Sequence, residues 1–185
     1  MRLLEVGATW LLEQGYHGTG IQAVLDDVGV PKGSFYNYFD SKEHFAAEVI
    51  RHVAGGSCSA LDDLAREAEK DALAALKRHL KRKIKQYEGN CCGGCLIGNL
   101  GNEVEDSELC RAAMAEAVAA MVARYTAVLE LGQGQGSIRD DVEAADLGAQ
   151  LFDAWEGGLL RMKIERSTRP LKLVVRRLLE EDFLA

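Results

Sequence analysis

The sequence has very little proline, the residue that most strongly disfavours the interior of a helix. Only two of the 185 residues are proline, Pro31 and Pro170. This scarcity permits helices over nearly the whole chain. No segment alternates apolar and polar residues as a half-buried strand would, and no internal repeat is evident. The sequence therefore predicts an all-α fold.

Long apolar runs are also lacking. None approaches the roughly 20 residues that a membrane-spanning helix needs. The first residues lack a signal-peptide pattern, because Glu5 and Glu13 interrupt periodically spaced apolar positions. We therefore expect a cytoplasmic protein with no membrane partner. In that compartment the five cysteines are expected to be free, reactive or metal-bound rather than joined in structural disulfides.

Positive charge is scarce, and this bears on nucleic-acid binding. The formal net charge is −7. Residues 1–54 hold four Lys and Arg against seven Asp and Glu, a balance of −3. Nucleic-acid binders usually carry a basic patch. Bulk charge therefore argues against DNA binding, and any DNA contact depends on where the few cations lie.

The residues that are present predict about nine helices. Nearly half of the chain is hydrophobic, and apolar positions recur at helical spacing. Gly15 is expected to stop the first helix, Thr19 to cap the second, and Asp40 or Ser41 to cap the fourth. The glycines at 55–56 are expected to interrupt the fourth helix. Later helices are expected at residues 59–88, 96–104, 107–131, 141–166 and 170–184.

One segment, "VGVPKGSFYNYFDSKEHF" at residues 28–45, predicts the second half of a helix-turn-helix. Gly29 suits a left-handed turn, and Pro31 suits the first turn of a short third helix running to about Tyr38. Phe35 and Phe39, one helical turn apart, are expected to face the core. The opposite edge carries small, polar and cationic residues: Lys32, Gly33, Ser34, Tyr36, Asn37 and Tyr38. The second helix of such a motif enters the major groove, but a compact helical corner without DNA fits the pattern too.

The longer stretch "TGIQAVLDDVGVPKGSFYNYFDSKEHF" strongly resembles the DNA-binding module of TetR-family transcriptional repressors. The resemblance implies a three-helix DNA-binding domain at residues 1–45 and an effector-binding and dimerisation domain at residues 46–185. It also implies a double-stranded operator, a small-molecule inducer and a homodimer. The positions that it assigns to DNA are Thr19, at a phosphate-contacting cap, together with Gln22, Lys32, Gly33, Ser34, Tyr36, Asn37, Tyr38 and Lys42.

The chain departs from the family at its start. Family members usually carry a basic arm before the first helix, whereas this sequence begins almost at that helix. The sequence does not tell whether such an arm is missing from the given start; a truncated start would account for part of the absent positive charge.

Three cysteines cluster in "NCCGGCLIGNLGNEVED". Cys91, Cys92 and Cys95 lie just before or at the start of a predicted helix, where the helix dipole favours a thiolate. A zinc site would need a second pair of ligands that this stretch lacks. A redox motif would need a βαβ context. Plain buried or loop cysteines and a reactive sensor thiol both remain open.

A second resemblance favours the sensor. "GCLIGNLGNEVED" and the later "WEGGLLRMKIERSTRPL" look like the N-ethylmaleimide-responsive and acrylate-responsive TetR regulators. By this resemblance Cys95 is the sensing thiol and Lys163 engages it, with Asn99 and Trp155 in the same effector-sensing region. In the acrylate-responsive type, Lys163 or Arg161 would instead hold a carboxylate. Cys91, Cys92 and Cys110 are possible resolving thiols, and covalent and non-covalent sensing both stay open.

The last two predicted helices carry an apolar stripe at three- and four-residue spacing: Leu147, Leu151, Trp155, Gly158, Leu159 and Met162, continued by Leu173, Val174, Leu178 and Phe183. Simple core packing would explain such a stripe. Because TetR-family members usually form two-fold dimers, we expect instead that these last two helices form the homodimer interface.

The sequence thus predicts a dimeric TetR-like repressor released by a small electrophile or unsaturated acid, with no cofactor, no metal and no catalytic residues. Two alternatives are a thiol-dependent enzyme and a helical protein-interaction adaptor. The enzyme would need a base near its thiol, and no histidine lies near the cysteines in sequence.

Overall fold

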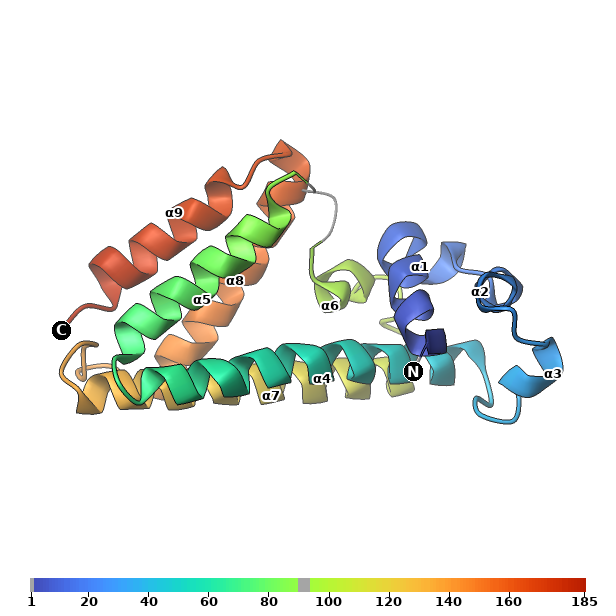
Figure 1. The fold of residues 1–185 in the computed structure, drawn as a ribbon, viewed down its shortest axis with the longest axis horizontal. Coiled ribbons are helices and arrows are strands. Elements are labelled where there is room, and N and C mark those ends of the chain that lie inside the picture. Colours follow the sequence, from blue (N-terminus) through green and yellow to red (C-terminus); the bar gives the residue numbers. More distant parts are fainter. Residues whose placement is uncertain (1, 90–93) are drawn as a thin grey trace. The chain divides into compact units, whose positions relative to one another are not determined.

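A computed structural model describes residues 2–89 and 94–185 of the chain (Figure 1). Nine α-helices and no strand occur in these ranges, as the sequence predicts. The helices are α1 (Arg2–Gly18), α2 (Ile21–Val28), α3 (Lys32–Phe35), α4 (Lys42–Ala68), α5 (Ala72–Tyr87), α6 (Leu96–Leu100), α7 (Glu108–Gly134), α8 (Ala144–Glu165) and α9 (Arg169–Arg177). A π-helical turn, η1 (Leu178–Asp182), follows α9.

The chain divides into two compact units, each built from two stretches. The first unit is Met1–Gly56 with Cys95–Val118, and the second is Ser57–Gly94 with Ala119–Ala185. The helices α4 and α7 each contribute one part to each unit. The predicted division into domains at residue 45 stays a prediction, since the units are defined by packing and not by function.

The first unit has its own apolar core. Side chains from α1 to α4, α6 and the start of α7 meet there, including Leu11, Leu25, Phe35, Phe45 and Leu100, all at most 2% exposed. Their spacing of three or four residues places one face of each helix inward. Burial of such side chains supplies the main stabilising free energy, about 1.5–3 kcal/mol each.

Gly15 disrupts α1 as the sequence predicts, although helical structure resumes as far as Gly18. Its φ of 71° and ψ of 178° break the helix, and only glycine adopts such a conformation readily. The carboxylate of Glu103 lies at this bend and accepts a hydrogen bond from the His17 N–H at 3.1 Å. A Cβ at Gly15 would lie 2.4 Å from the Glu103 carboxylate, so a larger residue would also displace that side chain.

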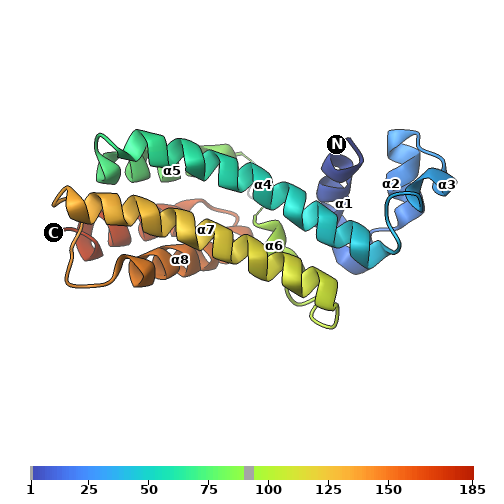
Figure 2. The same cartoon turned by 90° about the horizontal axis from the view of Figure 1, so that it is seen from below.

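The second unit is a helical bundle of the later parts of α4 and α7 with α5, α8 and α9 (Figure 2). The Asp62 carboxylate of α4 accepts a hydrogen bond from Arg124 of α7 at 2.8 Å. Asp71 caps α5, because its side chain accepts from the Ala74 N–H at 2.9 Å. Helices α8 and α9 pack closely, since a Cβ at Gly158 would lie only 3.0 Å from the Leu171 side chain.

The expected break of the fourth helix is wrong. Helix α4 continues through Gly55 and Gly56 to Ala68. The single helix expected at residues 59–88 is therefore wrong as well, because α5 begins anew after the Asp71 cap. Both glycines are exposed. Glycine costs an exposed helix position only about 1 kcal/mol relative to alanine, which burial of neighbours such as Leu61 and Leu64 outweighs.

The expected role of the α8 stripe as an interface also requires correction. Leu147, Leu151, Trp155, Leu159 and Met162 are at most 4% exposed within the single chain. They face the second unit's own core, and so do Leu178 and Phe183 of the C-terminal segment. These residues therefore follow the core-packing alternative, whereas Leu173 of the same predicted stripe stays 42% exposed.

Helix α7 is, among the described helices, the one long and apolar enough to cross a membrane by length and composition. Its apolar residues have another explanation. Cys110, Ala113, Ala117, Val128 and Leu129 are all at most 4% exposed, at the spacing of a core-facing helix. Core packing thus accounts for the apolar residues on the buried face of the helix.

Candidate functional site

A tight turn joins α2 to α3 and sets the direction of the short helix. Gly29 ends α2 in the left-handed conformation, with φ 69°. The Val30 N–H donates to the Leu25 carbonyl at 3.0 Å, which closes the end of α2. Pro31, with φ −62°, precedes the first helical residue of α3. The predicted turn chemistry is confirmed, although α3 ends at Phe35 and only turns continue to Tyr38.

Phe35 anchors α3. It is 1% exposed, and its ring centroid lies 5.1 Å from that of Phe39 and 5.5 Å from that of Phe45. These edge-on and tilted contacts are the geometries that aromatic pairs prefer. The predicted inward face of the segment is confirmed, and the opposite edge is left to solvent.

The edge opposite Phe35 carries most of the residues that the sequence assigns to DNA. Two of them are large aromatics, with Tyr36 54% and Tyr38 74% exposed. Lys32, Gly33 and Asn37 are exposed as well, and Ser34 is half-buried. We call this set the α3 edge: Lys32, Gly33, Ser34, Tyr36, Asn37 and Tyr38.

The flanking residues differ from the sequence-based expectation in one case. Thr19 does not cap α2, because Gly20 occupies the cap position without a side-chain bond. The Thr19 side chain is buried, and its hydroxyl donates to the Gly15 carbonyl at 2.6 Å. It therefore holds the bend in α1 and has no free hydroxyl for a phosphate. Gln22 is exposed and donates to the Asp26 carboxylate at 2.8 Å.

Lys42 lies at the start of α4, where the sequence places it. Its amine is half-buried and sits 4.5 Å from the centroid of the Tyr16 ring, in a cation–π contact. Burial lowers the pKa of this amine. The side chain of Lys42 is thus held against α1 in the absence of DNA.

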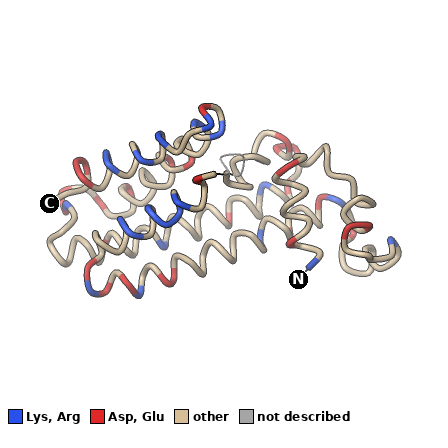
Figure 3. The backbone as a smooth tube through the Cα atoms, turned by 45° about the horizontal axis from the view of Figure 1, so that its top comes forward, with Lys and Arg blue, Asp and Glu red and all other residues tan. Residues whose placement is uncertain are grey.

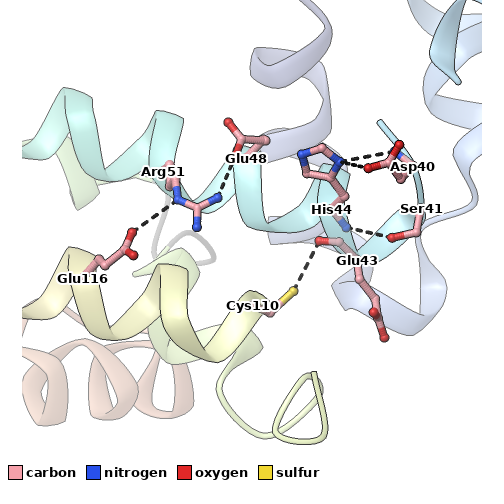
Figure 4. A network of polar contacts seen from close by, with 8 residues as sticks. All are labelled: Asp40, Ser41, Glu43, His44, Glu48, Arg51, Cys110 and Glu116. Atoms are coloured by element: carbon pink, nitrogen blue, oxygen red, sulfur yellow. Dashed lines mark hydrogen bonds and ion pairs between the residues drawn. The ribbon is translucent and has the colours of Figure 1, made fainter. Parts of the chain in front are cut away.

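A network of polar contacts fixes the start of α4 (Figure 4). Ser41 caps the helix, because its hydroxyl accepts from the His44 N–H at 3.0 Å; the prediction of a cap at this position is confirmed. Farther along, Arg51 donates to Glu48 at 2.7 Å and to Glu116 of α7 at 3.3 Å. Since α4 begins directly after the α3 edge, these contacts hold the segment on which that edge depends.

Cys110 is buried in the same network, which argues against the predicted role as a resolving thiol. Its thiol donates to the Glu43 carbonyl at 3.6 Å (Figure 4), and the residue is fully buried. Burial raises the pKa of the thiol, so little thiolate is present at neutral pH. Cys58 is half-buried in α4.

Cys95 occupies the predicted place at a helix start. It is the N-cap residue of α6 and is half-buried, and its carbonyl accepts from the Asn99 N–H at 2.9 Å. The expectations for Cys91 and Cys92 lie outside the described residues. Within residues 2–89 and 94–185, no group of three or more His, Cys, Asp and Glu is arranged to hold a metal ion.

The other expected sensor residues lie on α8. Trp155 is 4% exposed. Arg161 is exposed and donates to Glu165 at 2.7 Å, and Lys163 is half-buried. Cys95 and Asn99 belong to the first unit and these three residues to the second. The pairing of Cys95 with Lys163 therefore stays a prediction.

Comparison with known proteins identifies the family. Residues 3–49 match the model described as "Bacterial regulatory proteins, tetR family", and residues 70–178 match "Tetracyclin repressor-like, C-terminal domain". The chain belongs to the TetR family. The first match contains the α3 edge, and the second spans α5 to α9.

Two curated relatives extend along nearly all of this TetR-family chain. The HTH-type transcriptional repressor DhaR from Mycobacterium sp. (strain GP1) is 34% identical over 170 residues, which cover 91% of this chain and 84% of the relative. The HTH-type transcriptional repressor NemR from Escherichia coli (strain K12) is 30% identical over 172 residues, which cover 92% and 86%. The chain is accordingly a TetR-family transcriptional repressor.

A solved structure agrees in fold. The crystal structure of the reduced form of E. coli NemR superposes with a TM-score of 0.91 at 29% identity, covering all of this chain and 95% of that one. The relatives are named as repressors, which favours a regulator over the thiol-dependent enzyme.

Proposed function

We propose that this repressor binds a two-fold operator through the α3 edge of each protomer, and that a small electrophile or unsaturated acid sensed at Cys95 releases it. The observation that carries the DNA-binding part is the exposure of Tyr36 and Tyr38 beside a fully buried Phe35. A segment that served only to pack would not keep two large aromatics in water.

Gly33 also supports the proposal that the α3 edge binds DNA. A Cβ at this position would meet no atom within 4 Å, so packing within the chain does not require glycine there. A bare backbone on an exposed helix edge costs helix stability. It is useful where another molecule's backbone comes close, as a phosphate backbone would.

Lys32 is the exposed cation of the α3 edge, and Tyr36 is its neighbour one turn along. Lys32→Ala and Tyr36→Phe are each expected to weaken operator binding by about 1–3 kcal/mol, because each removes a direct contact to DNA. Fluorescence anisotropy with a labelled operator duplex measures the loss. Lys81→Ala, at an exposed position of α5, removes the same charge as Lys32→Ala and serves as the control. Unchanged binding by both edge variants would refute the assignment.

The homodimer would use an exposed face of α8 and α9, which includes Leu173 of the predicted stripe but none of the stripe's buried α8 residues. Leu160 is 61%, Ile164 72% and Leu173 42% exposed. An apolar groove of about 310 Å³ lies between the same two helices. A Cβ at Gly157, on its rim, would meet no atom within 4 Å, which leaves room for a partner helix. Self-association would cover this face and set the two α3 edges on one operator.

The sensing part of the proposal starts from Cys95. As the N-cap of α6 it lies where helix N–H groups favour a thiolate, and it is half-buried rather than sealed in the core. Among the described cysteines, Cys110 is excluded by its burial. The likeness to NemR, whose solved structure is called a reduced form, also favours thiol chemistry.

Cys95→Ser is expected to bind operator like the wild type and to lose release by an alkylating inducer such as N-ethylmaleimide. Serine fills nearly the same space but is not alkylated under these conditions. Operator release is titrated with the inducer while mass spectrometry identifies the modified peptide. Cys58→Ser, at another half-buried cysteine, is the matched control and is expected to respond normally.

Release of Cys95→Ser at wild-type inducer concentrations would contradict covalent sensing. The non-covalent alternative, with Lys163 or Arg161 holding a carboxylate, would then replace it. Lys163→Met separates the two. In the covalent case it slows alkylation of Cys95, because a nearby ammonium no longer stabilises the thiolate. In the non-covalent case it weakens acrylate binding and leaves the alkylation rate unchanged.

A further inference from the structure

A basic groove of about 820 Å³ lies between α4 and α5, wholly within the second unit. Five of its ten lining residues are Lys or Arg and two are acidic, a balance of +3 in a chain whose net charge is −7. Figure 3 shows the cations of α5 as a run of blue along that helix. The lining residues are Ala60, Asp63, Arg66, Glu67, Lys70, Arg78, His79, Arg82, Lys83 and Gln86.

Ion pairs hold the two walls of the groove in place. Glu67 of α4 accepts a hydrogen bond from Arg82 of α5 at 3.0 Å and lies 3.6 Å from Arg78. Arg82 and Arg78 lower the pKa of the Glu67 carboxyl, so it stays ionised. On α4 itself, Arg66 pairs with Asp63. Both carboxylates of the lining are thus engaged by arginines, and the excess charge is positive.

His79 is the one buried residue of the lining. It is 5% exposed, and its ring meets the Tyr125 ring edge-on at 6.4 Å. Its Nε2 is buried and has no hydrogen-bond partner among the described residues. Burial, with help from Lys83 and Arg82, lowers the pKa of His79 to about 4. The ring is therefore neutral near pH 7 and can carry its proton on Nε2 as a donor.

A buried polar atom without a hydrogen-bond partner is costly and uncommon. Leaving one unpaired costs about 1–3 kcal/mol, and most buried polar groups in native proteins find a partner. The groove therefore combines a net positive charge with the unpartnered Nε2 of His79. Together they suit a ligand that accepts hydrogen bonds and carries negative charge.

We propose that this groove binds a small polyvalent anion, one of whose oxygens accepts a hydrogen bond from His79 Nε2 while Lys70 and Arg78 hold the rest of its charge. A small ligand fits better than a nucleic-acid backbone. His79 is reached only by a group that enters the groove, and Asp63 and Glu67 place negative charge within the walls. The proposal does not depend on DNA binding or on Cys95.

Calorimetry on the full chain with inorganic pyrophosphate, and separately with citrate, tests the site at constant ionic strength. Saturable binding of either anion is expected, and the preferred one distinguishes a phosphate ligand from a polycarboxylate. His79→Phe is expected to weaken binding about tenfold or more, because it removes a hydrogen bond to a charged group. Lys70→Gln, at an exposed position, is expected to weaken it about twofold to fivefold.

Lys81→Gln is the matched control, since it removes the same charge from an exposed position of α5 outside the lining. It is expected to bind within about twofold of the wild type. If Lys81→Gln and Lys70→Gln lost anion affinity equally, the loss would reflect the net charge of the protein and not a local contact, and the proposed site would be overturned. Absence of saturable binding to both anions would overturn it too.

Two further measurements keep the proposal open to refutation if His79→Phe does not fold. Pyrophosphate or citrate is expected to shift the imidazole nitrogen resonances of His79 in the wild-type chain, and unshifted resonances at saturation would overturn the contact. A non-operator duplex is expected not to displace the bound anion. Displacement by the duplex would identify the groove as a nucleic-acid surface and overturn the small-ligand proposal.

Discussion

The double substitution Leu160→Glu with Ile164→Glu is expected to convert the protein from dimer to monomer while the chain stays folded. Both side chains are more than 60% exposed, so charge there costs the single chain little. In a dimer through this face, the four added carboxylates would be buried without partners, at a cost of several kcal/mol. Analytical ultracentrifugation measures the assembly state, and circular dichroism reports the fold.

Operator affinity is expected to fall with the dimer. In a dimer, binding of the first α3 edge holds the second close to its half of the operator, which raises the effective concentration of that edge. A monomer lacks this gain, so operator affinity is expected to fall about 100-fold or more. Ala123→Glu with Ala127→Glu adds the same charge at exposed positions of α7 and is the matched control. A dimeric Leu160→Glu, Ile164→Glu protein with wild-type affinity would refute this interface.

A charge placed in the buried stripe of α8 is expected to unfold the protein, in contrast to a charge on the exposed face. Trp155→Asp is expected to unfold the second unit rather than to split a dimer, because it buries an unpaired charge in a position 4% exposed within one chain. Circular dichroism would detect the loss of helix. A folded Trp155→Asp monomer would instead place the interface on the stripe.

Phe35→Ala is expected to destabilise the chain by about 3–5 kcal/mol, the usual cost of removing a fully buried phenylalanine. Phe35 is the residue through which α3 contacts both Phe39 and Phe45, so operator binding should be lost as well. Urea denaturation measures the free energy of unfolding, and anisotropy measures DNA binding.

Tyr38→Ala is the control for this position, since Tyr38 is 74% exposed three residues along. It is expected to change stability by no more than about 0.5 kcal/mol, while still weakening DNA binding through the α3 edge. If Phe35→Ala unfolded no more easily than Tyr38→Ala, Phe35 would not be the anchor of the short helix.

The sequence by itself determined the features that depend on local chemistry. Gly29 and Pro31 predict the turn between α2 and α3 because few residues tolerate those backbone conformations. Asp40 and Ser41 predict a helix cap because the side-chain oxygen of either can accept from an N–H in the first turn, and the structure selects Ser41. The four-residue spacing of Phe35 and Phe39 fixes which edge of α3 faces outward. These residues define the outward edge, and the resemblance to TetR-family repressors assigns that edge to DNA.

Tertiary structure alone decided what covers each apolar or polar face. Periodicity shows that one face of α8 is apolar, but not that the chain's own core covers Trp155 while Leu160 and Ile164 stay exposed. Thr19 is a residue type that often caps helices, yet its hydroxyl donates a hydrogen bond to the Gly15 carbonyl at the bend in α1. The six cations of α5, with no carboxylate among them, are visible in the sequence. Only packing against α4 and Tyr125 places His79 beneath them, because burial depends on neighbours that are distant along the chain.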